Sequence, residues 1–373
     1  MPTYPFTLTM LSPVHIGTGE EIDPNEYVVV EEKRGDVTEY IVDVIDLPAF
    51  LGSLTPELRR EFDDAVSRNA IFYVRRFIAD RCDTRRFRRY SCSTNEEFYN
   101  LYREGLTRDA SQLQVNTMTR TGADARPYIP GSSLKGSIRT AVVAVRAAEA
   151  ERRKPGSLES LADREFEPVV LGYRNERGRP EIRADPFRAV RITDAPLPSD
   201  TISIDPAEIF APGRAAGSPD PAGIQMYYEM TFSALDNQTV QARGTIAIDD
   251  RLATQPAPRG RGWDFDHCVS QRLTIEDLLG ACRSFYVDRL KKENEDFYQK
   301  HGKAAKAGER LRALAGAMKG NETLIRLGRF SHFECVTVGP PFARPPKRDA
   351  GRTRTLAAGE LPMGWAKLTI DGM

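Results

Sequence analysis

Hydrophobic and polar residues alternate at the start of the chain. Every second residue from Tyr4 to Met10 is apolar, and threonines lie between them. A period of two predicts a half-buried β-strand. Two further β-rich runs, 27–32 and 39–45, are joined by a short segment that contains Gly35. This arrangement predicts a β-hairpin.

From about residue 55 to residue 103 the pattern changes to charged helical spacing. Thr55 followed by Pro56 is typical of a helix start, because threonine caps the free N–H groups and proline needs none. Seven arginines lie between residues 75 and 89, against two aspartates. We interpret about 55–115 as a helical, arginine-rich insertion. Its arginines either neutralise phosphates or pair with acidic groups of this chain or a partner.

A turn-forming segment at 122–130 leads into a second helical pattern. Ile138, Ala141, Val142 and Val145 fall on one face, which predicts an amphipathic helix. Helical character fades near residue 155.

The second half mixes strands and helices without strict alternation. A helix is expected to start at Thr274, because Asp277 completes a capping box. Such a mixture predicts an α+β fold with antiparallel sheets. The predicted strands are 189–193, 227–232, 240–248 and 324–327, and Pro- and Gly-rich loops are predicted at 211–223 and 256–262.

Composition narrows the functional classes. The 53 basic and 53 acidic residues cancel, whereas a free-standing nonspecific nucleic-acid binder is strongly basic. Any RNA site must therefore be a local groove. The five cysteines are scattered without a CxxC pair, which argues against a disulfide framework and a zinc site. The absence of a secretory signal or a run of about 18 apolar residues favours a cytoplasmic protein without membrane association.

The helix that begins near Gly131 is the most informative segment. Gly131, Ser132 and Ser133 stand at its start. Backbone N–H groups are free there, at the positive end of the helix dipole. Lys135 and Arg139 lie about one turn apart on one side. Together these residues predict a phosphate-binding cradle. It is not a nucleotide P-loop, because the order of the lysine and glycine is reversed. The alternative is an ordinary capped helix that packs on a sheet.

A second candidate is the loop formed by His15, Gly17, Thr18 and Gly19. It either contacts RNA or supplies His15 as the general base of a metal-independent endoribonuclease. The other histidines are distant in sequence, which favours a histidine that forms hydrogen bonds within its loop. The nearby acidic cluster 20–23 could hold a divalent cation, but such clusters are usually solvated. We assign no metal, no cofactor and no catalytic residue.

A third candidate, Arg329, follows the predicted strand 324–327 and stands after Gly328. The glycine permits a close approach of the backbone to a ligand.

Four segments carry a resemblance to a known family. The chain resembles the RAMP superfamily of CRISPR proteins and, within it, the fifth Csm subunit of type III-A effector complexes. The segments are LSPVHIGTGEEIDP at 11–24, YIPGSSLKGSIRT at 128–140, RITD at 191–194 and LPMGW at 361–365. One departure is the late loop, which has a single glycine at Gly328 where many RAMP proteins have several.

The resemblance implies two ferredoxin-like (RRM-like) domains, expected at 1–154 and 186–373 with a connector at 155–185. It implies a non-catalytic subunit that binds the 3′ part of the crRNA at one end of the complex and is needed for crRNA maturation and antiviral defence. The implied partners are the crRNA, the RAMP backbone subunit and the small helical subunit, with target RNA contacted indirectly. The backbone subunit cleaves target RNA with an aspartate, and Asp23 is the nearest counterpart here.

Overall fold

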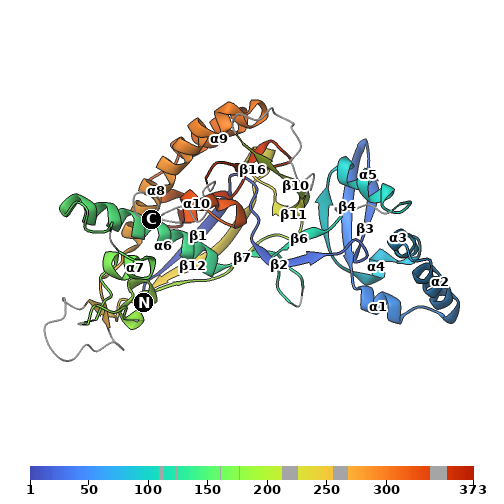
Figure 1. Ribbon diagram of the computed structural model, residues 1–373, viewed down its shortest axis with the longest axis horizontal. Coiled ribbons are helices and arrows are strands. Elements are labelled where there is room, and N and C mark those ends of the chain that lie inside the picture. The colour runs from blue at the N-terminus through green and yellow to red at the C-terminus, as the bar shows by residue number, and fades with distance from the viewer. Residues whose placement is uncertain are drawn as a thin grey trace.

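The computed structural model contains two large β-sheets with helices packed on them, so the predicted α+β class is confirmed (Figure 1). The predicted loop 256–262, and all of the predicted loop 211–223 except Ala211, lie outside the described residues. The structure describes residues 1–108, 113–122, 124–159, 161–175, 177–211, 226–254, 268–336 and 351–373.

The first sheet has five strands, all antiparallel to their neighbours. Phe6, Leu8 and Met10 are fully buried, which confirms the strand predicted from alternation at the start of the chain. The strand order is β15 (Glu322–Arg326), β18 (Trp365–Ile370), β1 (Thr3–Met10), β12 (Gln241–Ile248) and β8 (Val190–Ile192).

The second sheet has nine strands and is mixed, because β10 pairs with β5 and β11 pairs with β6 in parallel. Its main path is β2 (Gly17–Ile22), β6 (Val115–Met118), β11 (Met226–Thr231), β10 (Ile202–Phe210), β5 (Arg88–Thr94), β4 (Val37–Ile45) and β3 (Tyr27–Arg34). Beside it run β16 (Arg354–Ala357) and β17 (Leu361–Pro362); two small ladders join β7 (Tyr128–Ile129) to β9 (Ala195–Pro196) and β13 (Ala253–Thr254) to β14 (Cys268–Val269).

The predicted hairpin is confirmed by the pairing of β3 with β4. The prediction of continuous helix through residue 103 is wrong at β5, which pairs with β4 and β10. In this strand exposed Arg89 alternates with Tyr90 and buried Cys92, so the period of two was hidden by the surrounding arginines. The helices of this region are α1 (Leu47–Gly52), α2 (Pro56–Ser67), α3 (Ile71–Arg81), α4 (Thr84–Phe87) and α5 (Glu96–Glu104).

The helix predicted after residue 130 is α6 (Gly131–Arg153), and the helix capped by Thr274 is α8 (Ile275–Asp296). The predicted capping box is present, with Thr274 and Asp277 each accepting the other's backbone N–H. The remaining helices are α7 (Asp163–Val170), α9 (Gly302–Gly316) and α10 (His332–Val336), and the 3-10 turns are η1 (Ile182–Ala184), η2 (Pro186–Ala189), η3 (Ala234–Asp236), η4 (Tyr298–Lys300) and η5 (Arg329–Ser331).

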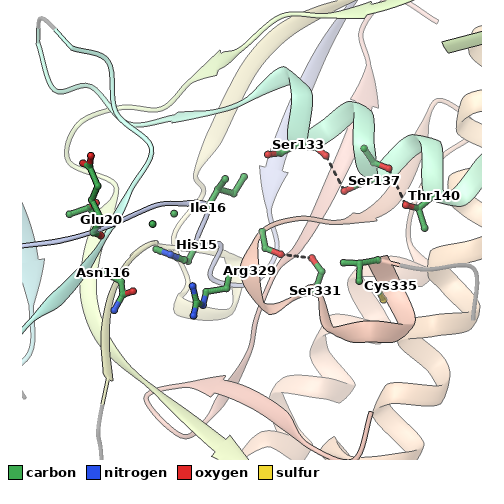
Figure 2. A pocket seen from close by; sticks show the side chains of 16 residues that line it. His15, Ile16, Glu20, Asn116, Ser133, Ser137, Thr140, Arg329, Ser331 and Cys335 are labelled. Carbon is green, nitrogen blue, oxygen red and sulfur yellow. Dashed lines mark hydrogen bonds between the residues drawn. The ribbon is translucent and has the colours of Figure 1, made fainter. Parts of the chain in front are cut away.

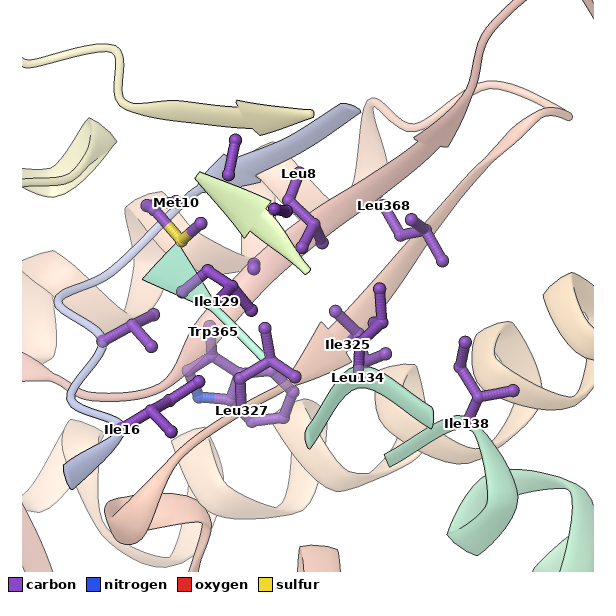
Figure 3. Packing of buried hydrophobic residues seen from close by; sticks show 14 of the residues in the cluster. Leu8, Met10, Ile16, Ile129, Leu134, Ile138, Ile325, Leu327, Trp365 and Leu368 are labelled. Atoms are coloured by element: carbon purple, nitrogen blue, oxygen red, sulfur yellow. The ribbon is translucent and has the colours of Figure 1, made fainter. Parts of the chain in front are cut away.

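Helix α6 lies over the first sheet, and its buried stripe closes the core there. Figure 3 shows Leu134 and Ile138 of α6 together with Leu8, Ile325 and Leu368 of the sheet. Each fully buried aliphatic side chain of this kind contributes roughly 1.5–3 kcal/mol relative to an exposed one. This packing fixes the orientation of α6 about its axis and therefore decides which of its polar residues face outward.

The strand pairing does not follow the predicted division at 155–185. Strand β1 lies between β12 and β18, and β6 lies beside β11, so each sheet takes strands from both 1–154 and 186–373. One continuous hydrophobic core also extends over both sheets. Alternation along a strand shows which residues are buried, but it does not show which strands become neighbours.

Candidate functional site

Three segments that are far apart in the sequence meet around one cavity of about 430 Å³ (Figure 2). They are the early histidine loop, the outward face of α6 and the late loop that contains Gly328, and β6 closes the remaining side. All three segments were predicted as candidates. The lining residues are His15, Ile16, Gly17, Gly19, Glu20, Asn116, Thr117, Ser133, Gly136, Ser137, Thr140, Gly328, Arg329, Ser331, Cys335 and Val336.

Backbone hydrogen bonds hold the early and late loops together. The N–H of Arg329 donates to the carbonyl oxygen of His15 at 3.0 Å, and the N–H of Gly364 donates to the carbonyl of Pro13 at 2.7 Å. Gly328 has φ +86°, and a Cβ there would lie 2.1 Å from the His15 carbonyl oxygen. Only glycine permits this approach. The single glycine retained in the late loop therefore stands at the contact point.

His15 is 2% exposed, although its segment lines the cavity. Its Nδ1 lies 2.7 Å from the carbonyl oxygen of Glu229. Because a carbonyl only accepts, Nδ1 carries the proton and Nε2 of the neutral ring is an acceptor. Burial lowers the pKa of His15, so the ring is neutral near pH 7. A Cβ at Gly17 would lie 2.6 Å from Nε2, which accounts for the glycine. The ring is thus bonded internally, but its partner lies on β11 and not within the histidine loop as predicted.

The carboxylate of Glu229 is fully buried beneath this loop. It accepts the N–H of Met118 at 2.8 Å and forms an ion pair with Arg120 at 3.1 Å. These contacts join β11 to β6. They hold in place the strand that presents Asn116 and Thr117 to the cavity.

A second buried charge cluster supports the late loop. Arg326 is 1% exposed and forms an ion pair with Glu293, which also pairs with Arg354. Burial alone would raise the pKa of Glu293, but the two guanidinium groups outweigh it and lower that pKa. Arg326 also donates to the carbonyl of Phe330 at 3.0 Å and stacks on the ring of Trp365. The cluster thus holds the chain immediately after Arg329.

Helix α6 presents small polar groups to the cavity. Ser133, Ser137 and Thr140 follow one another at helical spacing, with exposed Gly136 among them. The hydroxyl of Ser137 donates to the carbonyl of Arg326 at 2.8 Å, which links α6 to β15. Sequence reasoning favoured the charged residues of this motif and missed Ser137 and Thr140. Their spacing at three and four residues along the helix was a signal that could have found them.

Lys135 and Arg139 lie on a different face of α6 and do not line the cavity. The Lys135 amine donates to the carbonyl of Val190 at 2.7 Å. Arg139 pairs with Glu167 at 2.7 Å and Asp185 at 2.8 Å. The two cations share one side of the helix, as expected, but both head groups are bound within the fold.

The start of α6 also has an internal partner. The N–H of Gly131 donates to the carboxylate of Asp194 at 2.8 Å, so a carboxylate occupies the position where the sequence predicts a phosphate. A Cβ at Gly131 would lie 2.2 Å from the carbonyl oxygen of Ile192. The glycine is needed for packing on β8. Of the two serines that follow, Ser132 is exposed and Ser133 lines the cavity.

The remaining predicted residues lie at or beside the cavity. Gly19 lines it, and exposed Thr18 forms a hydrogen bond with Thr117 at 3.0 Å. Arg329 is exposed, with its guanidinium 5.8 Å from the centre of the Tyr228 ring. Among the described lining residues it is the only lysine or arginine, and no ion pair to it occurs in the described part of the chain.

The arginine-rich stretch lies on other elements, α3, α4 and β5, in the part of Figure 1 away from α6. Arg81 pairs with Glu61 at 2.9 Å, Arg76 with Asp80 at 3.7 Å and Arg88 with Asp43 at 3.5 Å. The first two pairs are exposed on both sides, whereas Asp43 of the third pair is buried. They fit the predicted alternative of pairing within the chain.

Two further observations concern binding classes. Within the described ranges, no three histidine, cysteine or acidic side chains gather as metal ligands would. None of the helices described combines the length and apolar character that crossing a lipid bilayer requires.

Comparison with known proteins gives one family match. A model of the RAMP superfamily matches residues 7–315. A chain in a cryo-EM structure of a Csm–crRNA–target RNA ternary complex of a type III-A CRISPR-Cas system is similar in fold, with a TM-score of 0.65 and 20% identity over 99% of this chain and 100% of that one. The crystal structure of T. onnurineus Csm5 is also similar, with a TM-score of 0.63 and 20% identity over 98% and 100%. No curated protein sequence matches.

Proposed function

The chain belongs to the RAMP superfamily, and we propose that it is a non-catalytic RNA-binding subunit of a type III-A CRISPR effector complex. The similarity in fold to a chain of the Csm complex and to Csm5 supports this proposal, because it extends over nearly the full length of each chain. In this proposal the protein binds the 3′ part of the crRNA at one end of the complex. It acts in crRNA maturation and antiviral defence in the cytoplasm.

One observation carries the proposal. Three segments, separated by more than a hundred residues along the chain, meet in a single cavity, and the exposed Arg329 is the one lysine or arginine among its described lining residues. An exposed arginine suits a phosphate, because its planar head offers several donors. A guide varies in sequence, so a protein that holds it should contact the backbone and leave the base edges free.

The finer description of the fold is also proposed. In the first sheet, β1, α6 and β8 are followed by β12, α8 and β18, which gives the βαββαβ succession of a ferredoxin-like domain. Strand β15 is then an addition at the edge. The nine-stranded sheet forms the second such unit, with α1–α4 as its helical insertion. Both units take residues from either side of 155–185.

We propose the crRNA, the RAMP backbone subunit and the small helical subunit as partners, with target RNA contacted only indirectly. Catalysis by His15 has little support from the geometry. Its Nδ1 proton is held by Glu229 and its ring is 2% exposed, whereas a general base must reach the proton that it removes.

The proposal is tested by Arg329→Ala in the assembled complex. We expect the variant to retain less crRNA, with a slope of binding against salt smaller by about 0.7, because one phosphate contact is lost. Arg312→Ala, an exposed arginine of α9 that does not line the cavity, is the matched control and should behave as wild type. Photo-crosslinking of the complex should give RNA adducts on peptides of the early loop or α6. A complex in which no adduct forms on this chain, and in which Arg329→Ala retains all its crRNA, contradicts the proposal.

A further inference from the structure

Two hydroxyl groups on the α6 side of the cavity, those of Ser137 and Thr140, have already used their protons. The Oγ of Ser137 lies 2.8 Å from the carbonyl oxygen of Arg326 and 3.2 Å from that of Ser133. A carbonyl oxygen only accepts, so the serine must donate its single proton there. What Ser137 can offer a ligand is the lone pairs of its oxygen.

The same reasoning applies to two neighbouring residues. Thr140 donates to the carbonyl of Gly136 at 3.1 Å, and Ser331 of the late loop donates to the carbonyl of Gly328 at 2.8 Å. Figure 2 shows these bonds along one side of the cavity. Each hydroxyl oxygen is therefore left as an acceptor.

The opposite wall repeats the pattern. Thr117 donates to the backbone carbonyl of Glu20 at 3.1 Å, so in its 3.0 Å contact with Thr18 the latter must be the donor. The amide nitrogen of Asn116 lies 3.4 Å from the carbonyl of Tyr227, which takes one of its two N–H groups. The Glu20 side chain adds a carboxylate, which only accepts.

The hydroxyl oxygens of Ser137, Thr140, Ser331 and Thr117 and the Glu20 carboxylate are therefore acceptors in the lining, and Arg329 is the one charged donor among its described residues. Phosphate oxygens are also acceptors, so they gain nothing from these five groups and are favoured beside Arg329. The ribose 2′-hydroxyl is a donor, and it is the group by which a protein distinguishes RNA from DNA at a given site.

We infer that the walls of this cavity recognise ribose 2′-hydroxyl groups as hydrogen-bond donors, so that the chain selects RNA over DNA at this site. The inference rests on the proposed function, because it assumes that single-stranded nucleic acid enters the cavity. To the proposed function it adds the chemical group that is recognised, the ribose 2′-hydroxyl. It also adds the residues that accept its hydrogen bond, which are Ser137, Thr140, Thr117 and Glu20.

The test uses oligouridines of one length whose sugars are ribose, deoxyribose or 2′-fluororibose. The fluorinated sugar keeps the conformation of ribose but has no donor. With the wild-type chain in its complex, we expect ribose to bind about threefold to tenfold more tightly per sugar contact than either of the others. Equal binding of the ribose and fluoro probes would mean that sugar shape is read, and it overturns the inference.

A substitution in the lining tests whether the preference for ribose arises in the cavity. Thr140→Val keeps the shape and removes the acceptor, so the preference for ribose over deoxyribose should fall about threefold or more. Thr107→Val is the matched control, because Thr107 is exposed outside the cavity and likewise donates to a helix carbonyl, that of Glu104, at 2.9 Å. An unchanged preference in Thr140→Val contradicts the inference. The proposed function fails separately, if no probe binds at all.

Discussion

The hydroxyl of Ser137 on α6 donates to the backbone carbonyl of Arg326 on β15, 189 residues further along the chain. The guanidinium of the same arginine is buried in the ion-pair cluster with Glu293 and Arg354. One residue thus joins the wall of the cavity to the charge cluster that supports the late loop. Changes in the cluster are expected to reach the cavity through this bond.

Glu293→Gln should destabilise the protein strongly. It leaves buried Arg326 without its carboxylate and Arg354 with Glu334 alone, and breaking a buried pair in this way costs about 3–5 kcal/mol. The measurement is the midpoint of chemical denaturation. Glu295→Gln, an exposed position on the same helix, should stay within about 0.5 kcal/mol of wild type. A Glu293→Gln protein as stable as this control would show that the cluster contributes little.

Gly328→Ala should lower stability and RNA retention together. Gly328 has φ +86° and ψ −173°, a region in which other residues are strained by about 1–3 kcal/mol, and the added Cβ would meet the His15 carbonyl. Gly280→Ala is the opposite control. It is exposed inside α8 with no atom near the added Cβ, so stability should rise by up to about 1 kcal/mol. Thermal melting of both variants measures whether stability falls in Gly328→Ala and rises in Gly280→Ala.

Stability should decrease as the pH falls from neutral toward 5, partly because of His332. Burial, assisted by Arg326, lowers the pKa of His332 to about 3. In the unfolded state the His332 imidazole therefore takes up a proton near pH 6.5, whereas in the folded state it stays neutral in this range. Between pH 7.5 and 5 this difference amounts to about 2 kcal/mol. His332→Asn does not titrate, so its denaturation midpoint should change less over that range. Parallel pH profiles for both proteins would contradict this.

Arg139→Ala should affect stability more than RNA binding. Its guanidinium joins Glu167 to Asp185, and the side chain is 22% exposed, so we expect a loss of about 1–3 kcal/mol with an unchanged salt slope for RNA. Arg164→Ala on α7, an exposed position, should change neither quantity. A reduced salt slope in Arg139→Ala would instead support the phosphate cradle predicted at the helix start.

RNA cleavage that depends on His15 is not expected. The purified protein, incubated with repeat-containing RNA in EDTA, should leave the RNA intact, because the buried neutral ring is committed to Glu229. His15→Ala is run beside it. Cleavage by the wild type that disappears in this variant would establish the endoribonuclease instead.

Much of the fold could be predicted because its local signals are strong. Alternation in β1, the β3–β4 hairpin and the capping box at Thr274 all depend on neighbouring residues, and all are present. Strand β5 was missed because arginines dominate its first residues. The pairing of β1 with β18 has no local signal, since a strand's pattern identifies its buried face and not its partner.

The sequence predicts which segments form the cavity better than it predicts which side chains line it. His15, Ser133 and Arg329 belong to three motifs that the sequence singles out, and the fold brings them to one cavity. Side-chain charge was a poor guide to which residues line the cavity. Lys135 and Arg139 stand out in the sequence, but their partners Val190, Glu167 and Asp185 become neighbours only in three dimensions.

The neighbouring positions of β1 and β18 have a consequence for biosynthesis. The N–H of Trp365 donates to the side chain of Ser12, a bond that spans 353 residues. While the ribosome is still translating, β1 has neither of its two sheet neighbours for most of that time and presents open backbone groups that invite misassociation. The cavity therefore becomes complete only after the late loop, up to Val336, has emerged and β18 has paired with β1.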